Sequence, residues 1–181
     1  MGMGRSDPLG VRLKSVLMVF VLLLQVPRSQ HGSVTQRVGT TDITISYNRP
    51  VARGRTLFGD DGVVHWGRLW HPGADSVTTI SFNKEITVEG HPLPAGRYSL
   101  WTITAKPPEQ WTVIFNRGVG GWHTNYPGES QDALRLKVST ENAPHIETLT
   151  WYFPLVDADS ALLRLQWGTV VVPIRIRTQP D

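Results

Sequence analysis

The segment Thr41-Asp42-Ile43-Thr44-Ile45-Ser46-Tyr47-Asn48-Arg49 decides the fold class, because apolar and polar residues alternate along it. In a strand, successive side chains point to opposite faces, so Ile43, Ile45 and Tyr47 share one face and the polar residues share the other. Similar short segments recur from Val34 onward, separated by Gly, Pro, Asn and Asp, and no helical periodicity lasts beyond about two turns. The sequence therefore predicts an all-β body.

Eight further segments read as strands. They span residues 77–82, 85–89, 97–104, 110–116, 133–139, 146–153, 161–167 and 169–176. Their number, spacing and turn frequency favour an antiparallel two-sheet β-sandwich of about nine to ten strands over a closed barrel. We find no internal repeat or linker, so residues 34–178 are expected to form a single β-sandwich domain.

Several local signals refine this prediction. Asn83-Lys84 predicts a tight hairpin that pairs Ile80 and Phe82 with the strand over 85–89. Residues 89–96 contain two prolines and two glycines, which force the chain to turn.

The last two predicted strands carry their own signals. Gly168 suggests a tight turn or a bulge between them, and Pro173 predicts that the final strand lies at a sheet edge. Both faces of residues 110–116 are partly apolar, so this strand is expected to be covered on both sides. Residues 117–132 form the longest irregular stretch, and long loops in compact domains are often functional.

The amino terminus reads as an export signal. Three cations within residues 1–14 precede a wholly apolar run over 16–24. This run is far shorter than the roughly 20 residues that span a bilayer, so a signal peptide over residues 1–29 is expected rather than a stable membrane span. The body is then expected to be extracytoplasmic, either periplasmic or secreted.

Charge and cysteine content exclude several classes of function. The 181 residues carry 18 Lys plus Arg and 15 Asp plus Glu. Four cations and one anion precede residue 30, so the body holds 14 of each sign and is neutral. A neutral body argues against a nucleic-acid or anionic-membrane partner. The chain has no cysteine, which excludes disulfides, thiol catalysis and cysteine-ligated zinc.

Polar and aromatic groups that can bind a ligand are concentrated on irregular segments. Arginine forks beside tryptophan can hold a carboxylate, a phosphate or a sugar. The predicted ligand-binding residues are Arg49, Arg53, Arg68, Trp70, His71, Asp75, Trp122 and Tyr126. The alternative is structural, since Asp60, Asp61 and Asp75 are close enough in sequence to pair with these arginines.

Five of the seven tryptophans divide into two groups. Trp111, Trp151 and Trp167 lie in strand registers among aliphatic residues and are expected to pack in the core. Trp70 and Trp122 lie in glycine-rich irregular segments and are expected at a surface or pocket, where an indole can stack on a saccharide. A small polar ligand, such as a saccharide, is therefore the leading expectation.

Other chemistries have weaker signals. His65, His71 and Asp75 do not follow a zinc-binding spacing, so neither a metal nor a cofactor is expected. No G-x-S-x-G nucleophile elbow is present. A hydrolase that uses Asp75, His71 or Asp132 as acid and base stays open, as does a structural or interaction module of the cell envelope. Catalytic residues and the oligomeric state are left unassigned.

Six segments, in order, resemble a bacterial family called domain of unknown function 2911. They are residues 38–50 (VGTTDITISYNRP), 54–59 (GRTLFG), 70–75 (WHPGAD), 93–100 (LPAGRYSL), 111–116 (WTVIFN) and 160–168 (SALLRLQWG). The resemblance spans about residues 34–176 and implies an exported, β-rich bacterial domain without implying an activity. Members of the family have Trp-Arg-x-Gly-Ala-Asn at the third segment, where this chain has His71 in place of the arginine.

Overall fold

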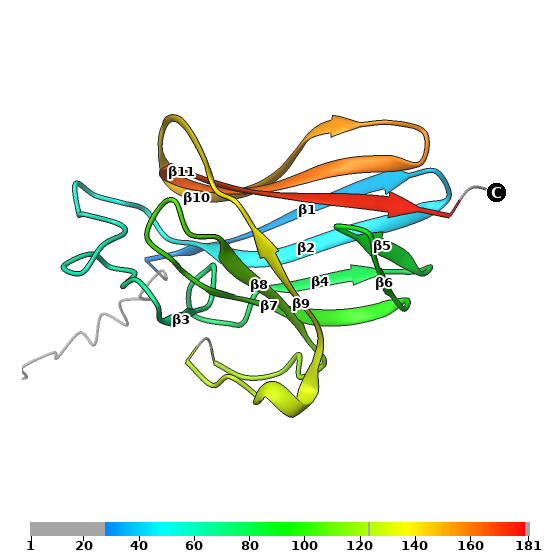
Figure 1. The fold of residues 1–181 in the computed structure, drawn as a ribbon, viewed down its shortest axis with the longest axis horizontal. Coiled ribbons are helices and arrows are strands. Elements are labelled where there is room, and N and C mark those ends of the chain that lie inside the picture. The colour runs from blue at the N-terminus through cyan, green and yellow to red at the C-terminus, as the bar shows by residue number, and fades with distance from the viewer. Residues whose placement is uncertain (1–27, 123, 180–181) are drawn as a thin grey trace, which may run out of the picture.

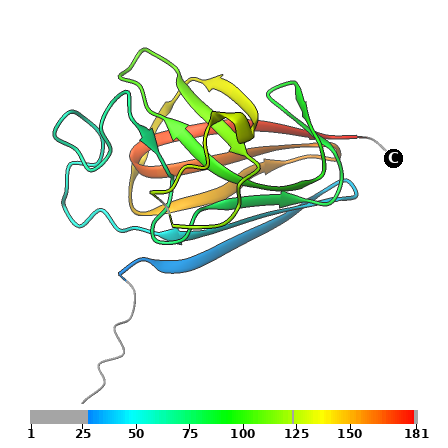
Figure 2. The same ribbon diagram turned by 90° about the horizontal axis from the view of Figure 1, so that it is seen from below.

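The protein is a sandwich of two antiparallel sheets, as the sequence predicts (Figures 1 and 2). The computed structural model describes residues 28–122 and 124–179, so the predicted leader over 1–29 lies almost entirely outside the described residues. The strands are β1 (Gln30–Val38), β2 (Thr41–Arg49), β3 (Leu69–Trp70), β4 (Thr79–Phe82), β5 (Ile86–Val88), β6 (His91–Leu93), β7 (Gly96–Ile103), β8 (Trp111–Asn116), β9 (Asp132–Val138), β10 (Glu141–Val156) and β11 (Ser160–Thr178). A short 3-10 turn covers Glu129–Gln131.

The two sheets differ in size. The larger has seven strands in the order β1-β2-β4-β7-β8-β9, with β3 also paired to β7, and the smaller has the order β10-β11-β5-β6. Their facing sides enclose one large hydrophobic core. On β2, Ile43 and Ile45 are fully buried and Tyr47 is 5% exposed, which confirms the face predicted from the alternation.

The predicted hairpin at Asn83-Lys84 is wrong. β4 pairs with β2 and β7 in the larger sheet, whereas β5 pairs with β11 and β6 in the smaller one. Residues 83–85 therefore carry the chain from one sheet to the other. Ile80 and Ile86 are both buried, but they enter the core from opposite sides. Alternation specifies which side chains face inward, and it does not distinguish pairing within a sheet from packing across the core.

The turn expected over residues 89–96 is present and contains an additional strand. Glu89 and Gly90 adopt positive φ angles of 48° and 84°, which reverses the chain after β5. β6 then pairs with β5 at the edge of the smaller sheet, where Pro92 lies opposite Thr87. An edge strand tolerates a proline, because one side of it makes no ladder bonds.

The two carboxy-terminal strands predicted from the sequence are one strand, β11, of 19 residues. Gly168 lies within it at a φ of 58°, and a Cβ there would lie 2.8 Å from the Leu57 Cδ1 atom. The edge predicted from Pro173 is wrong, because β11 lies between β10 and β5. Pro173 is accommodated because pairing with β10 reaches only Val171 and pairing with β5 begins at Ile176.

β7 and β8 lie inside the larger sheet and are covered on both faces. The inner face contributes to the main core, and a second buried cluster of Val77, Trp101 and Ile114 forms outside it. Tyr126, from the long loop over 117–131, packs against this second cluster. The expectation that residues 110–116 are covered on both sides is confirmed.

Within residues 28–122 and 124–179, no helix is long and apolar enough to cross a membrane.

Candidate functional site

The end of the sandwich at which β2 leaves its sheet is closed by backbone pairing between the two sheets. After Arg49 the chain pairs with β10: the Ala52 amide donates to the Glu147 carbonyl at 2.7 Å, and the Leu149 amide donates to the Pro50 carbonyl at 2.9 Å. The loop that follows, up to β3, projects from this end of the molecule (Figure 1, cyan to teal). This crossing places Arg53 and Arg55 beside the end of the core.

A second loop, residues 71–78, reaches the same end of the sandwich. It leaves the sheet at a gap between β3 and β4, which pair with different parts of β7. β3 pairs with β7 at residues 102–103, and β4 pairs with it at residues 96–99. β8 occupies the other side of β7 over residues 99–103, so β3 and β4 lie on the same side. Residues 71–78 leave the sheet between β3 and β4, so His71 and Asp75 lie at the end of the sandwich, next to Trp70 at the end of β3.

His71 closes the base of this loop. Its ring is 3% exposed, and its Nε2 atom accepts a hydrogen bond from the Thr78 amide. An imidazole nitrogen that accepts a hydrogen bond carries no proton, so Nε2 is an unprotonated nitrogen of the ring. Gly73 packs directly against this pair, since a Cβ there would lie 2.8 Å from the His71 Cε1 atom. His71 therefore has a positioning role in the loop.

These segments enclose a cavity of about 680 Å³, which we call the end cavity. Three tryptophans line it: Trp70 at the end of β3, Trp101 on β7 and Trp167 on β11. The Trp70 and Trp167 rings are stacked, with centroids 6.2 Å apart and an interplanar angle of 13°. Because both rings also pack on the main core, one aromatic cluster forms part of the core and part of the cavity lining.

Guanidinium groups supply the charge of the end cavity. Arg28, Arg53 and Arg55 line it, and no Asp or Glu is among the described lining residues. Arg55 is fixed in place, because its Nε donates to the Ala52 carbonyl at 2.9 Å and one terminal nitrogen donates to the Val51 carbonyl at 2.7 Å. The end cavity therefore combines aromatic surface with positive charge.

Three of the eight residues predicted to bind a ligand line the end cavity: Arg53, Trp70 and His71. Two others lie close to it. Asp75 follows the lining residues Gly73 and Ala74 and accepts a hydrogen bond from the Asn48 side chain at 3.3 Å. Trp122 forms a backbone bridge with Ser76, and its side chain is 52% exposed.

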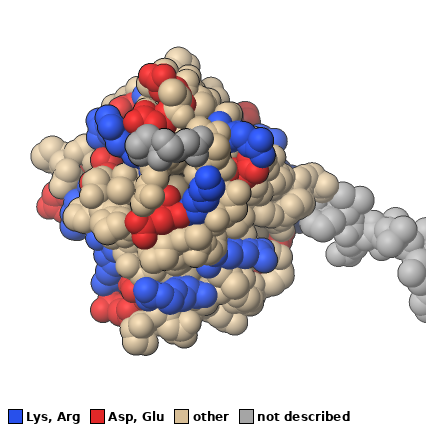
Figure 3. Space-filling model, turned by 90° about the vertical axis from the view of Figure 1, so that its right-hand side faces the viewer, with Lys and Arg blue, Asp and Glu red and all other residues tan. Residues whose placement is uncertain are grey.

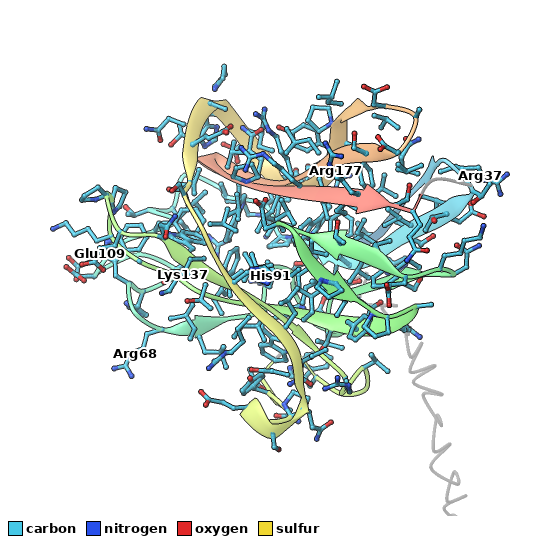
Figure 4. The ribbon with its side chains drawn as sticks, turned by 45° about the vertical axis from the view of Figure 1, so that its right-hand side comes forward. Arg37, Arg68, His91, Glu109, Lys137 and Arg177 are labelled. Atoms are coloured by element: carbon cyan, nitrogen blue, oxygen red, sulfur yellow. The ribbon has the colours of Figure 1, made fainter. Side chains whose placement is uncertain are left out.

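The other three predicted residues are engaged elsewhere. Arg49 ties β2 to β10, donating to the Leu149 carbonyl at 3.2 Å and to the Thr150 hydroxyl at 2.8 Å. Arg68 is exposed and points away from the body of the protein (Figure 4). Tyr126 packs edge-on against Trp101, with ring centroids 5.2 Å apart, so it contacts the back of a lining residue.

The Tyr126 hydroxyl belongs to a buried network that fixes the loop over 117–131. It donates to the Asp132 carboxylate at 2.6 Å, the Asn116 amide donates to the same carboxylate at 2.7 Å, and Arg135 pairs with it at 3.0 Å. The Asp132 side chain is 5% exposed. The pKa of Tyr126 is raised from 10.0 to about 12. Burial of the hydroxyl is the largest cause, and the hydrogen bond to Asp132 is the second. The network stabilises the loop and, through Trp101, one wall of the end cavity.

The tryptophan assignments made from the sequence are confirmed for the core. Trp111, Trp151 and Trp167 are each at most 2% exposed. Trp101 and Arg55 are two of the cavity-lining residues that the sequence analysis did not select. The repeated Arg53-Gly54-Arg55 was a usable signal for Arg55, whereas Trp101 lies in a strand whose pattern indicates only packing.

The structural alternative that paired arginines with nearby aspartates is not realised for two of the three aspartates. Of the ion pairs within the described part of the chain, none involves Asp60 or Asp61. The loop is held instead by backbone hydrogen bonds, such as that from the Val64 amide to the Leu57 carbonyl at 2.8 Å, and by a hydrogen bond between His65 Nδ1 and the Asp60 carbonyl at 2.8 Å. No group of three or more His, Asp or Glu suited to a metal ion occurs among the residues described.

A second hollow, of about 410 Å³, lies along the β8–β9 side and contains none of the predicted binding residues. Glu109 and Lys137, which line it, are labelled in Figure 4. The described residues that line it include no tryptophan and combine charges of opposite sign. The end cavity is therefore the stronger candidate for a functional site.

Comparison with known proteins yields one match. The profile of a family described as "Protein of unknown function (DUF2911)" matches residues 29–176, which covers β1 to most of β11. No curated protein and no solved structure matches the chain. The resemblance inferred from the six sequence segments is thereby confirmed.

Proposed function

The chain belongs to the family of proteins of unknown function DUF2911, and from this premise we propose that it is an exported domain that binds a small polar ligand, such as a saccharide, in the end cavity. The observation that carries the proposal is the convergence of Arg53, Trp70 and His71 on that cavity. Arg53 lies in the turn after β2, whereas Trp70 and His71 are adjacent at the end of β3, and a common ligand site accounts for the meeting of these two segments.

The dimensions and chemistry of the end cavity support this function. Its volume of about 680 Å³ lies within the range of about 300–1,000 Å³ that is typical of small-molecule sites. Tryptophan faces contact the C–H groups of a sugar ring, while guanidinium groups fix its oxygens. The lining of tryptophan and arginine offers both kinds of contact.

Hydrolysis receives less support from the same residues. The Nε2 atom of His71 is occupied by the Thr78 amide, so it is not available to accept a proton from water. The Asp132 carboxylate accepts hydrogen bonds from Tyr126 and Asn116 and pairs with Arg135. These contacts suit a structural carboxylate better than an acid or base.

An interaction module of the cell envelope also receives less support. Val63, Leu69 and Trp122 are exposed apolar side chains, and Val63 and Leu69 line the end cavity. Val63 and Leu69 are better understood as the apolar rim of a ligand site than as a separate docking surface.

A cavity-filling variant tests the proposal. We expect a saccharide array or a thermal-shift panel of mono- and disaccharides to identify at least one binder. Val63→Trp should abolish this binding, because Val63 is 44% exposed at the cavity and a larger ring there occupies its opening. Leu155→Trp is the matched control, since Leu155 is 63% exposed and does not line the cavity. Absence of any saccharide binder, or equal binding by Val63→Trp, would contradict the proposal.

Export is tested separately. Amino-terminal sequencing of the protein recovered outside the cytoplasm should begin after about residue 24, where the apolar run ends. Recovery of an intact amino terminus in the cytoplasm alone would contradict export.

A further inference from the structure

We infer that the ligand of the end cavity is an anion, with a carboxylate or phosphate group held by Arg53 and Arg55 and a sugar-like body against the tryptophans. This inference rests on the proposed function and names the charge class of its ligand. It follows from how the two arginines are held, from the absence of acidic groups in the lining, and from the aromatic surface beside them.

The backbone presents both arginines at the cavity. Arg53 and Gly54 adopt positive φ angles of 53° and 70°, which form a tight turn directly after the residues that pair with β10. The Arg53 amide donates to a Glu147 carboxylate oxygen at 3.1 Å, and the Arg55 amide donates to the Ala52 carbonyl at 3.2 Å. A non-glycine residue with positive φ is uncommon and costs free energy, so the surrounding contacts must maintain this turn.

Arg55 is preorganised for an anion. Its Nε and one terminal nitrogen donate to the Ala52 and Val51 carbonyls, which fixes the guanidinium plane. The other terminal nitrogen makes no hydrogen bond within the described part of the chain, and a fixed guanidinium loses little side-chain entropy when a ligand binds.

No carboxylate neutralises this charge within the described residues. Arg53 and Arg55 take part in none of the ion pairs found there, and no Asp or Glu lines the cavity. The Glu147 carboxylate accepts a hydrogen bond from the Arg53 backbone amide and lies 3.9 Å from the His145 ring. A neutral sugar would desolvate the two guanidinium groups without compensating their charge, whereas an anion would pair with them.

The aromatic surface specifies the rest of the ligand. Trp70 is half-buried and lines the cavity, and Leu69 and Val63 lie at its exposed rim. An inorganic anion would leave this apolar surface unused, so the preferred ligand carries both a charge and a ring. Arg28 also lines the cavity, but it belongs to the predicted leader, and the inference does not depend on it.

Charge-matched sugars test the inference. Isothermal titration calorimetry on the purified protein would compare glucose, glucosamine, glucuronate and glucose 6-phosphate, so that neutral, cationic, carboxylate and phosphate probes share one ring. We expect at least one anionic probe to bind about tenfold to a hundredfold more tightly than glucose, as one added charge-assisted hydrogen bond provides. Its affinity should fall as salt is raised, because the guanidinium groups are not fully enclosed.

Substitution of each arginine tests whether Arg53 and Arg55 cause the preference for an anionic probe. Arg53→Gln and Arg55→Gln should each weaken the anionic probe about tenfold and glucose by less, because a guanidinium binds a charged group more strongly than a neutral hydroxyl. Arg55 also stabilises its own turn, so its loss can affect folding as well as binding. Arg55→Lys retains the charge, and a thermal melt of each variant measures its folding stability. Together these two controls separate effects on the ligand from effects on folding. Arg68→Gln is the matched control, since Arg68 is an exposed arginine near the same loop that does not line the cavity.

The outcomes separate the two proposals. Glucose binding as tightly as glucuronate and glucose 6-phosphate would overturn the charge inference and leave saccharide binding intact. An anion preference that survives both arginine substitutions would overturn the assignment to Arg53 and Arg55. If no probe and no saccharide on the array binds, both the proposed function and the charge inference fail.

Discussion

The two ends of the sandwich use arginine in opposite ways. At the end formed by the β1–β2 and β10–β11 turns, which we call the hairpin end, Arg37 pairs with Asp42 at 2.7 Å and Arg177 lies 3.9 Å from Asp159. Figure 3 shows this end, with cationic and anionic side chains interspersed across it, and Figure 4 labels Arg37 and Arg177. At the cavity end, Arg53 and Arg55 have no carboxylate partner among the described residues.

This difference shows why overall composition is a poor guide to binding. The hairpin-end pairs are exposed, and such pairs contribute little to stability because water already screens their charges. The cavity-end arginines converge on a concave aromatic site, where screening is weaker and an anion gains more. A body with equal numbers of cations and anions can therefore still contain a site of one sign.

The largest expected effect comes from Trp167, which belongs to both the core and the end cavity. Trp167 is 2% exposed and stacks on Trp70. Trp167→Ala should lower the free energy of unfolding by about 3–5 kcal/mol, because it removes a large buried ring and leaves a void. Urea denaturation monitored by circular dichroism measures this change.

Trp122→Ala is the control for this prediction. The Trp122 side chain is 52% exposed, so its loss should change the free energy of unfolding by no more than about 1 kcal/mol. Equal losses for the two tryptophan variants would show that the cavity end is not continuous with the core.

A smaller effect is expected at Tyr126, which supports the cavity wall from behind. Tyr126→Phe removes the hydroxyl that donates to Asp132 at 2.6 Å. We expect a loss of about 1.5–3 kcal/mol in the free energy of unfolding, the usual range for a hydrogen bond to a charged group. Weaker binding of the cavity ligand should accompany it, because Tyr126 packs against Trp101.

The same residue predicts a pH dependence. The pKa of Tyr126 is raised from 10.0 to about 12 in the folded protein, so the folded state holds this proton more tightly than the unfolded state. Its stabilisation is complete below pH 10.0 and is lost as the pH rises through about 12. Denaturation across this range should show a steeper loss for the wild type than for Tyr126→Phe, and parallel curves would contradict the assignment.

The smallest effect is expected at the hairpin end. Hydrogen bonding to Asp42 raises the pKa of Arg37, and the same bond lowers the pKa of Asp42, but both side chains are open to solvent, with exposed fractions of 70% and 40%. Arg37→Gln should therefore leave the free energy of unfolding and ligand affinity unchanged within error. A loss of ligand affinity in Arg37→Gln as large as in Arg53→Gln would remove the distinction between the two ends.

Much of the fold was predictable because it depends on local alternation. The inward face of β2, the long loop over 117–131 and the central position of residues 110–116 all followed from the order of apolar and polar residues. The failures at Asn83-Lys84 and Pro173 have one cause. The residue pattern of a strand does not specify which other strand pairs with it. Sequence patterns therefore could not distinguish a hairpin from a crossing between sheets.

For the candidate site, the sequence selected residue types better than it selected positions. Arg53, Trp70 and His71 line the end cavity, whereas Arg49 and Arg68, of the same chemistry and nearby in the chain, do not. The difference arises from β2 crossing to β10, which uses Arg49 as a link between the sheets.

The sequence by itself determined an all-β sandwich, its family, the buried tryptophans and a neutral body without cysteine, because these properties follow from composition and from short-range periodicity. Only the tertiary structure decided which arginines remain unpaired and which tryptophans meet them. That outcome depends on the gap between β3 and β4 beside β7, and on the pairing of residues 50–52 with β10, which closes the end of the sandwich. Both features arise from contacts between segments far apart in the chain.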